Sequence, residues 1–230
     1  MPAAPPPAAP FDAALIDLDG TLVDTLGDFE RALGLMLSAL HLPGIGRPFI
    51  ERTVGRGSEY LIEKTLAQVG APAERYEEAF ASYQAHYAVV NGRHSSVYPG
   101  AEAGVERLLQ RGLRLVCLTN KPGALAVGLL RAKGLERHFT AIYGGDAFER
   151  KKPHPMPLLR ACESLGTAPA RTLMIGDSSN DAQAARAAGC PVVLVTYGYN
   201  HGEPVTGVDA DGHVDRIDAL DLEAVAARSR

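Results

Sequence analysis

Short apolar runs alternate with amphipathic segments over much of the chain. The apolar runs are typical of buried strands, which we expect at residues 13–18, 113–118, 140–143, 172–175 and 192–196. Helical spacing of apolar residues, closed in each case by a glycine, predicts helices at residues 99–110, 123–133, 155–165 and 181–188. The alternation predicts an α/β fold with a parallel sheet that carries helices on both faces. A loop at 205–211 and a final helix at 217–227 are expected to follow.

Residues 26–92 interrupt this alternation with a different pattern. Apolar residues recur there at helical spacing, which predicts helices at residues 26–41, 47–54, 58–69 and 73–90. No stretch of this segment reads as a strand, so we expect an all-helical insertion of residues 26–92 in a core of residues 11–25 and 93–230. One face of the last helix carries an aromatic stripe, which we interpret as a packing seam rather than a ligand site: Tyr76, Phe80, Tyr83 and Tyr87.

Composition narrows the functional classes. The formal net charge is −4 with no basic stripe, which argues against a nucleic-acid partner. No apolar run approaches the ~18 residues that a membrane span needs, so no membrane partner is expected. Residues 1–10 hold only Ala and Pro after the Met, which predicts a disordered tail rather than a secretory signal. Three widely separated cysteines indicate reduced thiols, and these features together predict a cytoplasmic protein.

Two carboxylates stand at the end of the first expected strand. Asp17 interrupts the apolar run and Asp19 follows two positions later, so both side chains point to the same side of the strand. Two buried ionised carboxylates are strongly unfavourable unless a cation or hydrogen-bond donors compensate them. The pattern therefore predicts a metal ion, although Asp19-Gly20 also suits an ordinary acidic turn.

Further polar residues follow the other expected strands. Thr119 and Asn120 end the second strand, where they can donate hydrogen bonds to an anion. Asp177 and Asp181 follow the fourth strand, and Lys152 precedes it. Because sites in open parallel sheets lie at the carboxyl ends of the strands, we expect these groups to converge. Taken singly, each also suits a turn, a helix cap or a solvated lysine pair.

The residues DLDGTLVD at 17–24 resemble the first motif of the haloacid dehalogenase-like superfamily, and of its phosphatases in particular. The other three motifs follow in the family's order as Thr119-Asn120, Lys152-Pro153 and GDSSND at 176–181. The helical insertion corresponds to the family's cap domain. The resemblance implies an α/β protein with a Rossmann-like parallel-sheet core and an inserted all-helical cap domain.

The resemblance also implies the chemistry. Asp17 would be the nucleophile that forms an aspartyl-phosphate, while Asp19 would protonate the leaving group and then activate water. The cofactor would be Mg²⁺, held by Asp17, the backbone carbonyl of Asp19 and Asp177. The implied activity is hydrolysis of a phosphate monoester.

The remaining motif residues would handle the phosphoryl group. The resemblance implies that Thr119 and Asn120 bind phosphoryl oxygens and that Lys152 neutralises their charge. Asp181 would orient Lys152 or a metal-bound water. These assignments transfer residue by residue, because each residue stands at the matching position of its motif.

Other activities fit the sequence less well. The superfamily's dehalogenases lack an acid at the position of Asp19, so dehalogenation is not expected. Its phosphonate hydrolases need a cap lysine that forms a Schiff base. Lys64 is the single lysine between residues 26 and 92, and it lies in an expected helix with no special sequence context. A phosphatase or phosphomutase for a sugar phosphate stays open. A receiver-type phospho-acceptor module would have about half this length, and a binding protein without activity would not need the intact acid pair.

Among these phosphatases the chain resembles the bacterial phosphoglycolate phosphatases, at residues 54–57 and 196–200. This implies a small phosphorylated metabolite, 2-phosphoglycolate, as substrate. Arg56 is expected to bind the substrate carboxylate, because the glycines on either side let the backbone turn toward the core. The alternative is a solvated surface arginine. The sequence indicates no oligomeric state.

Overall fold

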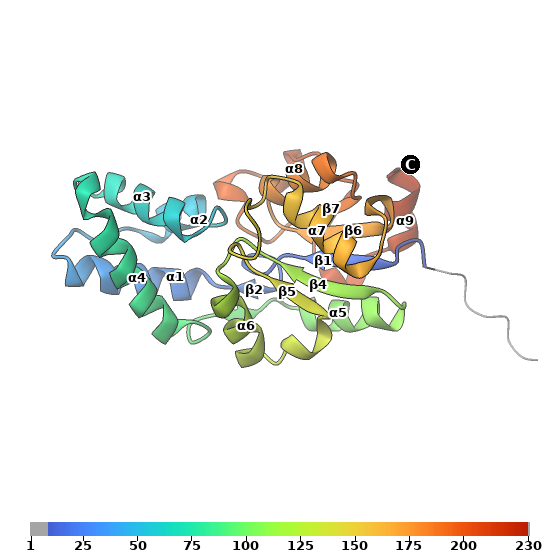
Figure 1. The fold of residues 1–230 in the computed structure, drawn as a ribbon, viewed down its shortest axis with the longest axis horizontal. Coiled ribbons are helices and arrows are strands. Elements are labelled where there is room, and N and C mark those ends of the chain that lie inside the picture. The colour runs from blue at the N-terminus through green and yellow to red at the C-terminus, as the bar shows by residue number, and fades with distance from the viewer. Residues whose placement is uncertain (1–8, 230) are drawn as a thin grey trace, which may run out of the picture.

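The computed structural model describes residues 9–229, and within them six parallel strands form one sheet in the order β5-β4-β1-β6-β7-β8 (Figure 1). The strands are β1 (Ala13–Ile16), β4 (Arg114–Leu118), β5 (Ala141–Tyr143), β6 (Thr172–Gly176), β7 (Val192–Val195) and β8 (Gly212–Val214). In the centre, Ile16 of β1 lies opposite Cys117 of β4 and Ile175 of β6. The predicted parallel sheet is therefore confirmed, and the chain leaves β1 in the middle of its carboxyl edge.

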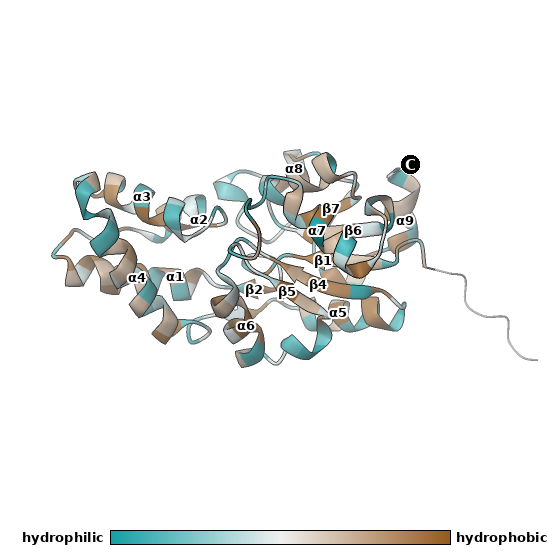
Figure 2. Ribbon diagram, viewed as in Figure 1, coloured by the Kyte–Doolittle hydropathy of each residue, from teal (hydrophilic) through white to brown (hydrophobic). Residues whose placement is uncertain are grey.

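Helices cover both faces of the sheet. One face carries α5 (Ala101–Gln110), α6 (Gly123–Ala132) and α9 (Leu222–Arg228), and the other carries α7 (Met156–Leu165) and α8 (Ser179–Ala188). Alternate residues of a strand point to opposite faces of the sheet: Ile16 packs with the first set of helices and Leu15 with the second. Figure 2 shows the strands as the most apolar part of this layered core. Burial on both faces explains the continuous apolar runs in the sequence.

The helical insertion forms a separate body beside the core (Figure 1). It consists of α1 (Leu26–Ala39), α2 (Arg47–Thr53), α3 (Ser58–Gln68) and α4 (Tyr76–Val90), with a 3₁₀ turn at Ala73–Arg75 before α4. Its buried residues, among them Leu33, Met36 and Ile62, make an apolar cluster distinct from those of the sheet. The predicted architecture of a parallel-sheet core with an inserted helical cap is confirmed. The residue boundaries chosen for the two domains stay a prediction.

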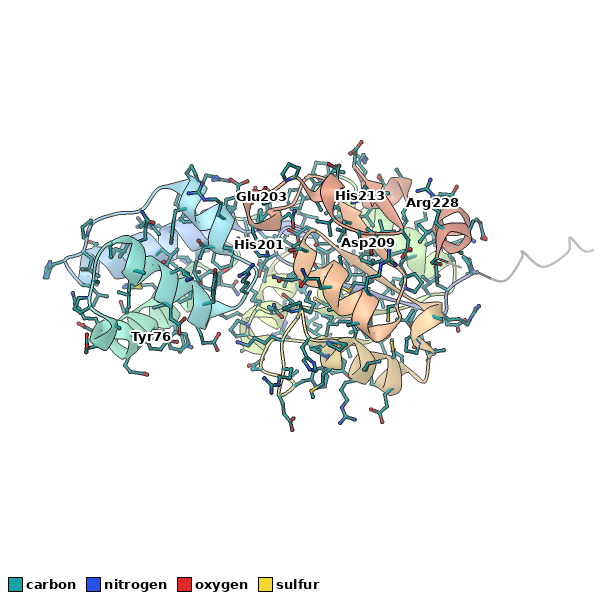
Figure 3. All side chains as sticks on the ribbon, turned by 90° about the horizontal axis from the view of Figure 1, so that it is seen from above. Tyr76, His201, Glu203, Asp209, His213 and Arg228 are labelled. Atoms are coloured by element: carbon teal, nitrogen blue, oxygen red, sulfur yellow. The ribbon has the colours of Figure 1, made fainter. Side chains whose placement is uncertain are left out.

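Two short strands join cap and core. In this connection β2 (Val23–Asp24) pairs antiparallel with β3 (Ser96–Val97). The buried carboxylate of Asp28 accepts hydrogen bonds from the backbone N–H groups of Gly92 at 2.8 Å and His94 at 2.7 Å. The segments that enter and leave the cap are thereby tied together. Figure 3 shows the labelled His201 where cap and core meet.

The C-terminal part departs from the prediction at two places. The edge strand β8 was not expected, because its three residues follow a polar stretch and form no apolar run. The helix predicted at 217–227 is wrong as one element: a 3₁₀ turn, Ile217–Ala219, precedes α9. Asp221 begins α9 by accepting hydrogen bonds from the N–H groups of Glu223 and Ala224. The other 3₁₀ turns are Glu136–His138, Pro169–Arg171, Asn200–Gly202 and Val205–Gly207.

Three further expectations concern the chain as a whole. Cys117, Cys162 and Cys190 are buried and unpaired, as predicted. Across residues 9–229, no helix combines the length and apolar character that crossing a bilayer requires. The tail predicted for residues 1–10 falls almost entirely outside the described residues. The cytoplasmic location stays a prediction.

Candidate active site

The carboxyl end of β1 presents Asp17 to a buried lysine. The ammonium group of Lys152 lies 3.0 Å from a carboxylate oxygen of Asp17 and 2.7 Å from one of Asp181, and it also donates to the carbonyl of Leu118 at 2.7 Å. Burial alone would lower the pKa of Lys152, but the two carboxylates outweigh it and raise that pKa above its ordinary value. Lys152 therefore stays positively charged at the centre of the site.

A cluster of carboxylates surrounds this charge. Asp17, Asp177 and Asp181 each place an oxygen within 4.8 Å of the other two. Burial raises the pKa of Asp17 to about 6, with Lys152 opposing the shift and Asp181 adding to it. Burial and the neighbouring carboxylates also raise the pKa of Asp177 well above its ordinary range. One buried lysine thus leaves negative charge uncompensated, which is the electrostatic condition for a bound cation.

Asp177 and Asp181 lie in the segment that follows β6, at the end of the strand and in the first turn of α8. Asp177 accepts hydrogen bonds from the Thr21 hydroxyl at 3.2 Å and from the backbone N–H of Tyr199 at 2.8 Å. Asp181 accepts from the Ser178 hydroxyl at 2.9 Å and forms a capping box with Ser178 at the start of α8. The expected contact of Asp181 with Lys152 is present, and so is the helix cap that the sequence also suited.

The turn after β1 depends on a glycine. Gly20 has a φ of +85°, and a Cβ atom there would lie 2.3 Å from the Asp177 carboxylate. Only glycine lets the backbone pass this close to the acidic cluster. The side chain of Asp19, on the preceding residue, accepts a hydrogen bond from the Lys121 ammonium at 3.0 Å. The sequence patterns predicted no role for Lys121, which directly follows Thr119-Asn120.

Thr119 and Asn120 end β4 beside these groups, as expected. Thr119 lines the same pocket as Asp17 and Asp19. The side-chain amide of Asn120, however, donates to the carbonyls of Gly55 at 2.9 Å and Lys152 at 2.8 Å and accepts from the Lys152 N–H at 3.0 Å. An asparagine side chain has two N–H donors, so both are already used. Asn120 positions Lys152 here and has no side-chain donor left for a phosphoryl oxygen.

The pocket lies between core and cap. Its core wall includes the motif residues Asp17, Asp19, Thr119 and Asn120, and its cap wall includes Phe29, Leu61, Tyr83 and Tyr87. Tyr83 and Tyr87 are also buried in the apolar cluster of the cap, so the aromatic stripe packs as predicted and lines the pocket as well. Tyr76, at the start of the stripe, lies on the outer side of the cap (Figure 3). The distinction between packing seam and ligand site was therefore too sharp.

Arg56, the predicted carboxylate ligand, does not line the pocket. Gly55 and Gly57 line the pocket, whereas the Arg56 guanidinium lies 5.1 Å from the centre of the Tyr60 ring. Both glycines have positive φ values, +101° and +94°, and the turn they make directs the Gly55 carbonyl toward Asn120. The backbone rather than the arginine thus faces the core.

The four motifs converge on one site, and the comparison with known families agrees. The model of the haloacid dehalogenase-like hydrolases matches residues 11–189, well over half of the chain. The chain belongs to this family. The predicted enzyme class, a hydrolase, is confirmed.

More specific similarity points to one group within the family. The chain is 43% identical to a phosphoglycolate phosphatase of Thiobacillus denitrificans, over 90% of this chain and 93% of that one. It is equally identical to a plasmid-encoded phosphoglycolate phosphatase of Cupriavidus necator, over 95% of both chains. The crystal structure of a predicted phosphoglycolate phosphatase from Haemophilus somnus 129PT matches with a TM-score of 0.86 and 30% identity, over 91% of this chain and 96% of that one. The resemblance expected from the sequence is confirmed.

Proposed function

We propose that this protein is a Mg²⁺-dependent phosphatase that hydrolyses 2-phosphoglycolate through a phosphorylated Asp17. The observation that carries the proposal is the buried group of three carboxylates around the ammonium of Lys152. The names of relatives that are 43% identical to this chain over the aligned residues support the substrate. The protein would act on a small phosphorylated metabolite in the cytoplasm.

The acidic cluster suits a divalent cation of the Mg²⁺ type. Its donors are carboxylate oxygens, which Mg²⁺ prefers, and they lie close enough together to share one ion. Asp17 and Asp177 would hold the ion together with the backbone carbonyl of Asp19. When bound, Mg²⁺ would neutralise charge on the carboxylates and on the phosphoryl group. The raised pKa values of Asp17 and Asp177 describe the cluster without that charge.

In the proposed first step, a carboxylate oxygen of Asp17 attacks phosphorus and the bond from phosphorus to the substrate oxygen breaks. Asp19 gives its proton to the departing alkoxide, which leaves as glycolate. The Asp19 side chain suits this role because it lines the pocket next to Asp17 and is not fully buried. In the second step Asp19 takes a proton from water, the water oxygen attacks phosphorus, and Asp17 is released with inorganic phosphate.

Lys152 and Thr119 would bind the phosphoryl oxygens. Lys152 offers a fixed positive charge that Asp181 and the carbonyl of Leu118 hold in place. Thr119 offers a hydroxyl at the pocket wall. Preorganised donors of this kind stabilise the transition state because they need no rearrangement when charge develops. Asn120 would act through Lys152, whose backbone it holds.

The test is phosphate release from 2-phosphoglycolate by the purified full-length protein. We expect turnover with Mg²⁺, none after EDTA treatment, and recovery when Mg²⁺ is restored. Asp17→Asn should reduce turnover at least about 10³-fold, the scale seen when a nucleophile is removed. The surface variant Asp209→Asn, whose side chain is exposed and pairs with Arg186, serves as the control.

Two results would overturn the proposal. Unchanged turnover in Asp17→Asn would exclude the phosphorylated aspartate. A wild-type protein that hydrolyses sugar phosphates but not 2-phosphoglycolate would retain the chemistry and change the substrate. Mass spectrometry of the rapidly quenched wild-type protein should also detect a phosphoryl group on the peptide that contains Asp17.

A further inference from the structure

Lys121 is a buried cation with no role in the mechanism above. Its side chain is 2% exposed, and its ammonium donates to Asp19 at 3.0 Å and to the Tyr87 hydroxyl at 2.5 Å. The same ammonium lies 4.9 Å from the ring centre of Phe29 and 4.5 Å from that of Tyr87. Lys121 thus connects the core to both long helices of the cap, at the pocket.

The two buried lysines of the site have different surroundings. Lys152 faces two carboxylates, Asp17 and Asp181, which together exceed its charge. Lys121 faces one carboxylate, Asp19, and otherwise a hydroxyl and two aromatic rings. Aromatic faces stabilise a cation without neutralising it. In the proposed mechanism Lys152 is assigned to the phosphoryl group, so Lys121 is the buried lysine that remains for a second anionic group of the substrate.

Apart from Lys121, the pocket residues that the structure describes offer no positively charged partner to a second anionic group of the substrate. Of the pocket-lining residues in the described part of the chain, Lys121 is the one that carries a positive charge. Arg56, the cation expected from the sequence, is directed toward Tyr60. The cap wall consists largely of apolar and aromatic side chains, so a second anionic group placed anywhere but beside Lys121 would lose water without gaining a positively charged partner.

We propose that Lys121 is the binding subsite for the carboxylate of the substrate. The inference rests on the proposed function, because it assumes a phosphate ester at Asp17. In phosphoglycolate one methylene group and one oxygen separate the carboxylate from phosphorus, and Lys121 follows the proposed phosphoryl ligand Thr119 by two residues. Substrate and enzyme therefore both place the two groups close together. The Lys121 ammonium, held by Tyr87 and Phe29, ion-pairs with the carboxylate that enters beside it.

The experiment compares 2-phosphoglycolate with its neutral amide, which has nearly the same size and the same phosphate ester. For the wild type, kcat/KM should favour the carboxylate by about 30-fold or more, the loss expected when one partner of a desolvated ion pair is removed. Lys121→Met should reduce this ratio to near 1, because Met fills the space without the charge. Lys121→Arg should recover part of the ratio, since it restores a cation.

Two matched variants act as controls. Lys64→Met makes the same change on the exposed face of α3, and its ratio should equal that of the wild type. Arg56→Met tests the cation that the sequence predicted for the carboxylate, and we expect the ratio to stay within about twofold. Using the ratio removes any effect of Lys121 on Asp19, because that effect applies to both esters alike.

The outcomes separate the two proposals. A wild type that hydrolyses neither ester refutes the proposed function, and the subsite falls with it. A wild type that hydrolyses both equally well refutes the subsite alone, whatever the variants do. A ratio that survives in Lys121→Met but collapses in Arg56→Met assigns the carboxylate to Arg56 and overturns the inference.

Discussion

The backbone carbonyl of Gly55, in the cap, accepts a hydrogen bond from the side chain of Asn120, in the core, at 2.9 Å. Asn180 on α8 donates to the same carbonyl at 3.2 Å. The loop between α2 and α3 is therefore held over the pocket through its backbone. Opening the cap must break both hydrogen bonds.

This arrangement predicts that Asn180→Ala raises KM for 2-phosphoglycolate roughly 2- to 10-fold, because one net hydrogen bond of the closed form is lost. Hydrogen exchange at residues 54–57 should accelerate in the same variant. Ser164→Ala removes a side-chain hydrogen bond of α7, away from the cap, and should change neither quantity. A normal KM with normal exchange in Asn180→Ala would argue against the closure role.

The raised pKa of Asp17 predicts a pH-dependent cost to stability in metal-free protein. Folding raises this pKa from 3.8 to about 6, so the folded state favours the protonated carboxyl. That contribution is fully present below pH 3.8 and is lost as the pH rises to about 6. The Asp17→Asn variant has no carboxyl group to titrate here, so it does not lose this stability as the pH rises. Its Tm relative to the wild type, measured in EDTA, should therefore rise between pH 4 and pH 6 and then level off.

A control and a metal titration complete this measurement. The pKa of Asp209 is lowered by its hydrogen bond to Arg186, so the Tm difference of Asp209→Asn should be flat above pH 5. Mg²⁺ at pH 7.5 should raise the Tm of the wild type and have less effect on Asp17→Asn. A Tm difference that does not change with pH for Asp17→Asn would contradict the predicted electrostatic cost.

Asp19→Asn should separate substrates by their leaving groups. An alkoxide needs a proton as it departs, whereas p-nitrophenolate does not. We expect kcat for 2-phosphoglycolate to fall about 10²- to 10⁴-fold, the usual contribution of a general acid, and kcat for p-nitrophenyl phosphate to fall much less. Equal losses would assign Asp19 a purely electrostatic role. Both rates are measured on one preparation, and their ratio does not depend on the concentration of active enzyme.

Asp28 should be important for stability rather than catalysis. It is buried and its two oxygens accept the N–H groups of Gly92 and His94. Asp28→Ala leaves both donors without this partner, which should lower the free energy of unfolding by about 2–5 kcal/mol in urea denaturation. Asp28→Asn keeps one acceptor oxygen and should be intermediate. A loss below about 1 kcal/mol for Asp28→Ala would show that water replaces the carboxylate.

Local patterns predicted most of the fold because the strands are buried on both faces. Continuous apolar runs placed β1, β4, β5, β6 and β7 within two residues. The strands β2, β3 and β8 are two or three residues long, too short to show periodicity, and they form only because neighbouring segments supply partners. The motif residues could be placed together because parallel strands share a carboxyl edge.

Side-chain direction could not be predicted in the same way. Arg56 stands between two glycines, and its sequence context fits a backbone turn equally well toward or away from the core. Asn120 was placed correctly, but its partners Gly55 and Lys152 come from distant parts of the chain. Lys121 has an unremarkable local sequence, and only the packing of α1 and α4 above it distinguishes it from a surface lysine.

The pairing of Val23 with Val97 has a consequence for how such an enzyme can diversify. Because the chain leaves and rejoins the core at neighbouring points, an insertion of any size could be exchanged there without altering the register of β1 against β4 and β6. The proposed catalytic residues and the cap wall of the pocket thus lie on separable segments of the chain. Lys121 and Thr119 both belong to the core, so under the proposals above a new cap would still meet the same positive charge.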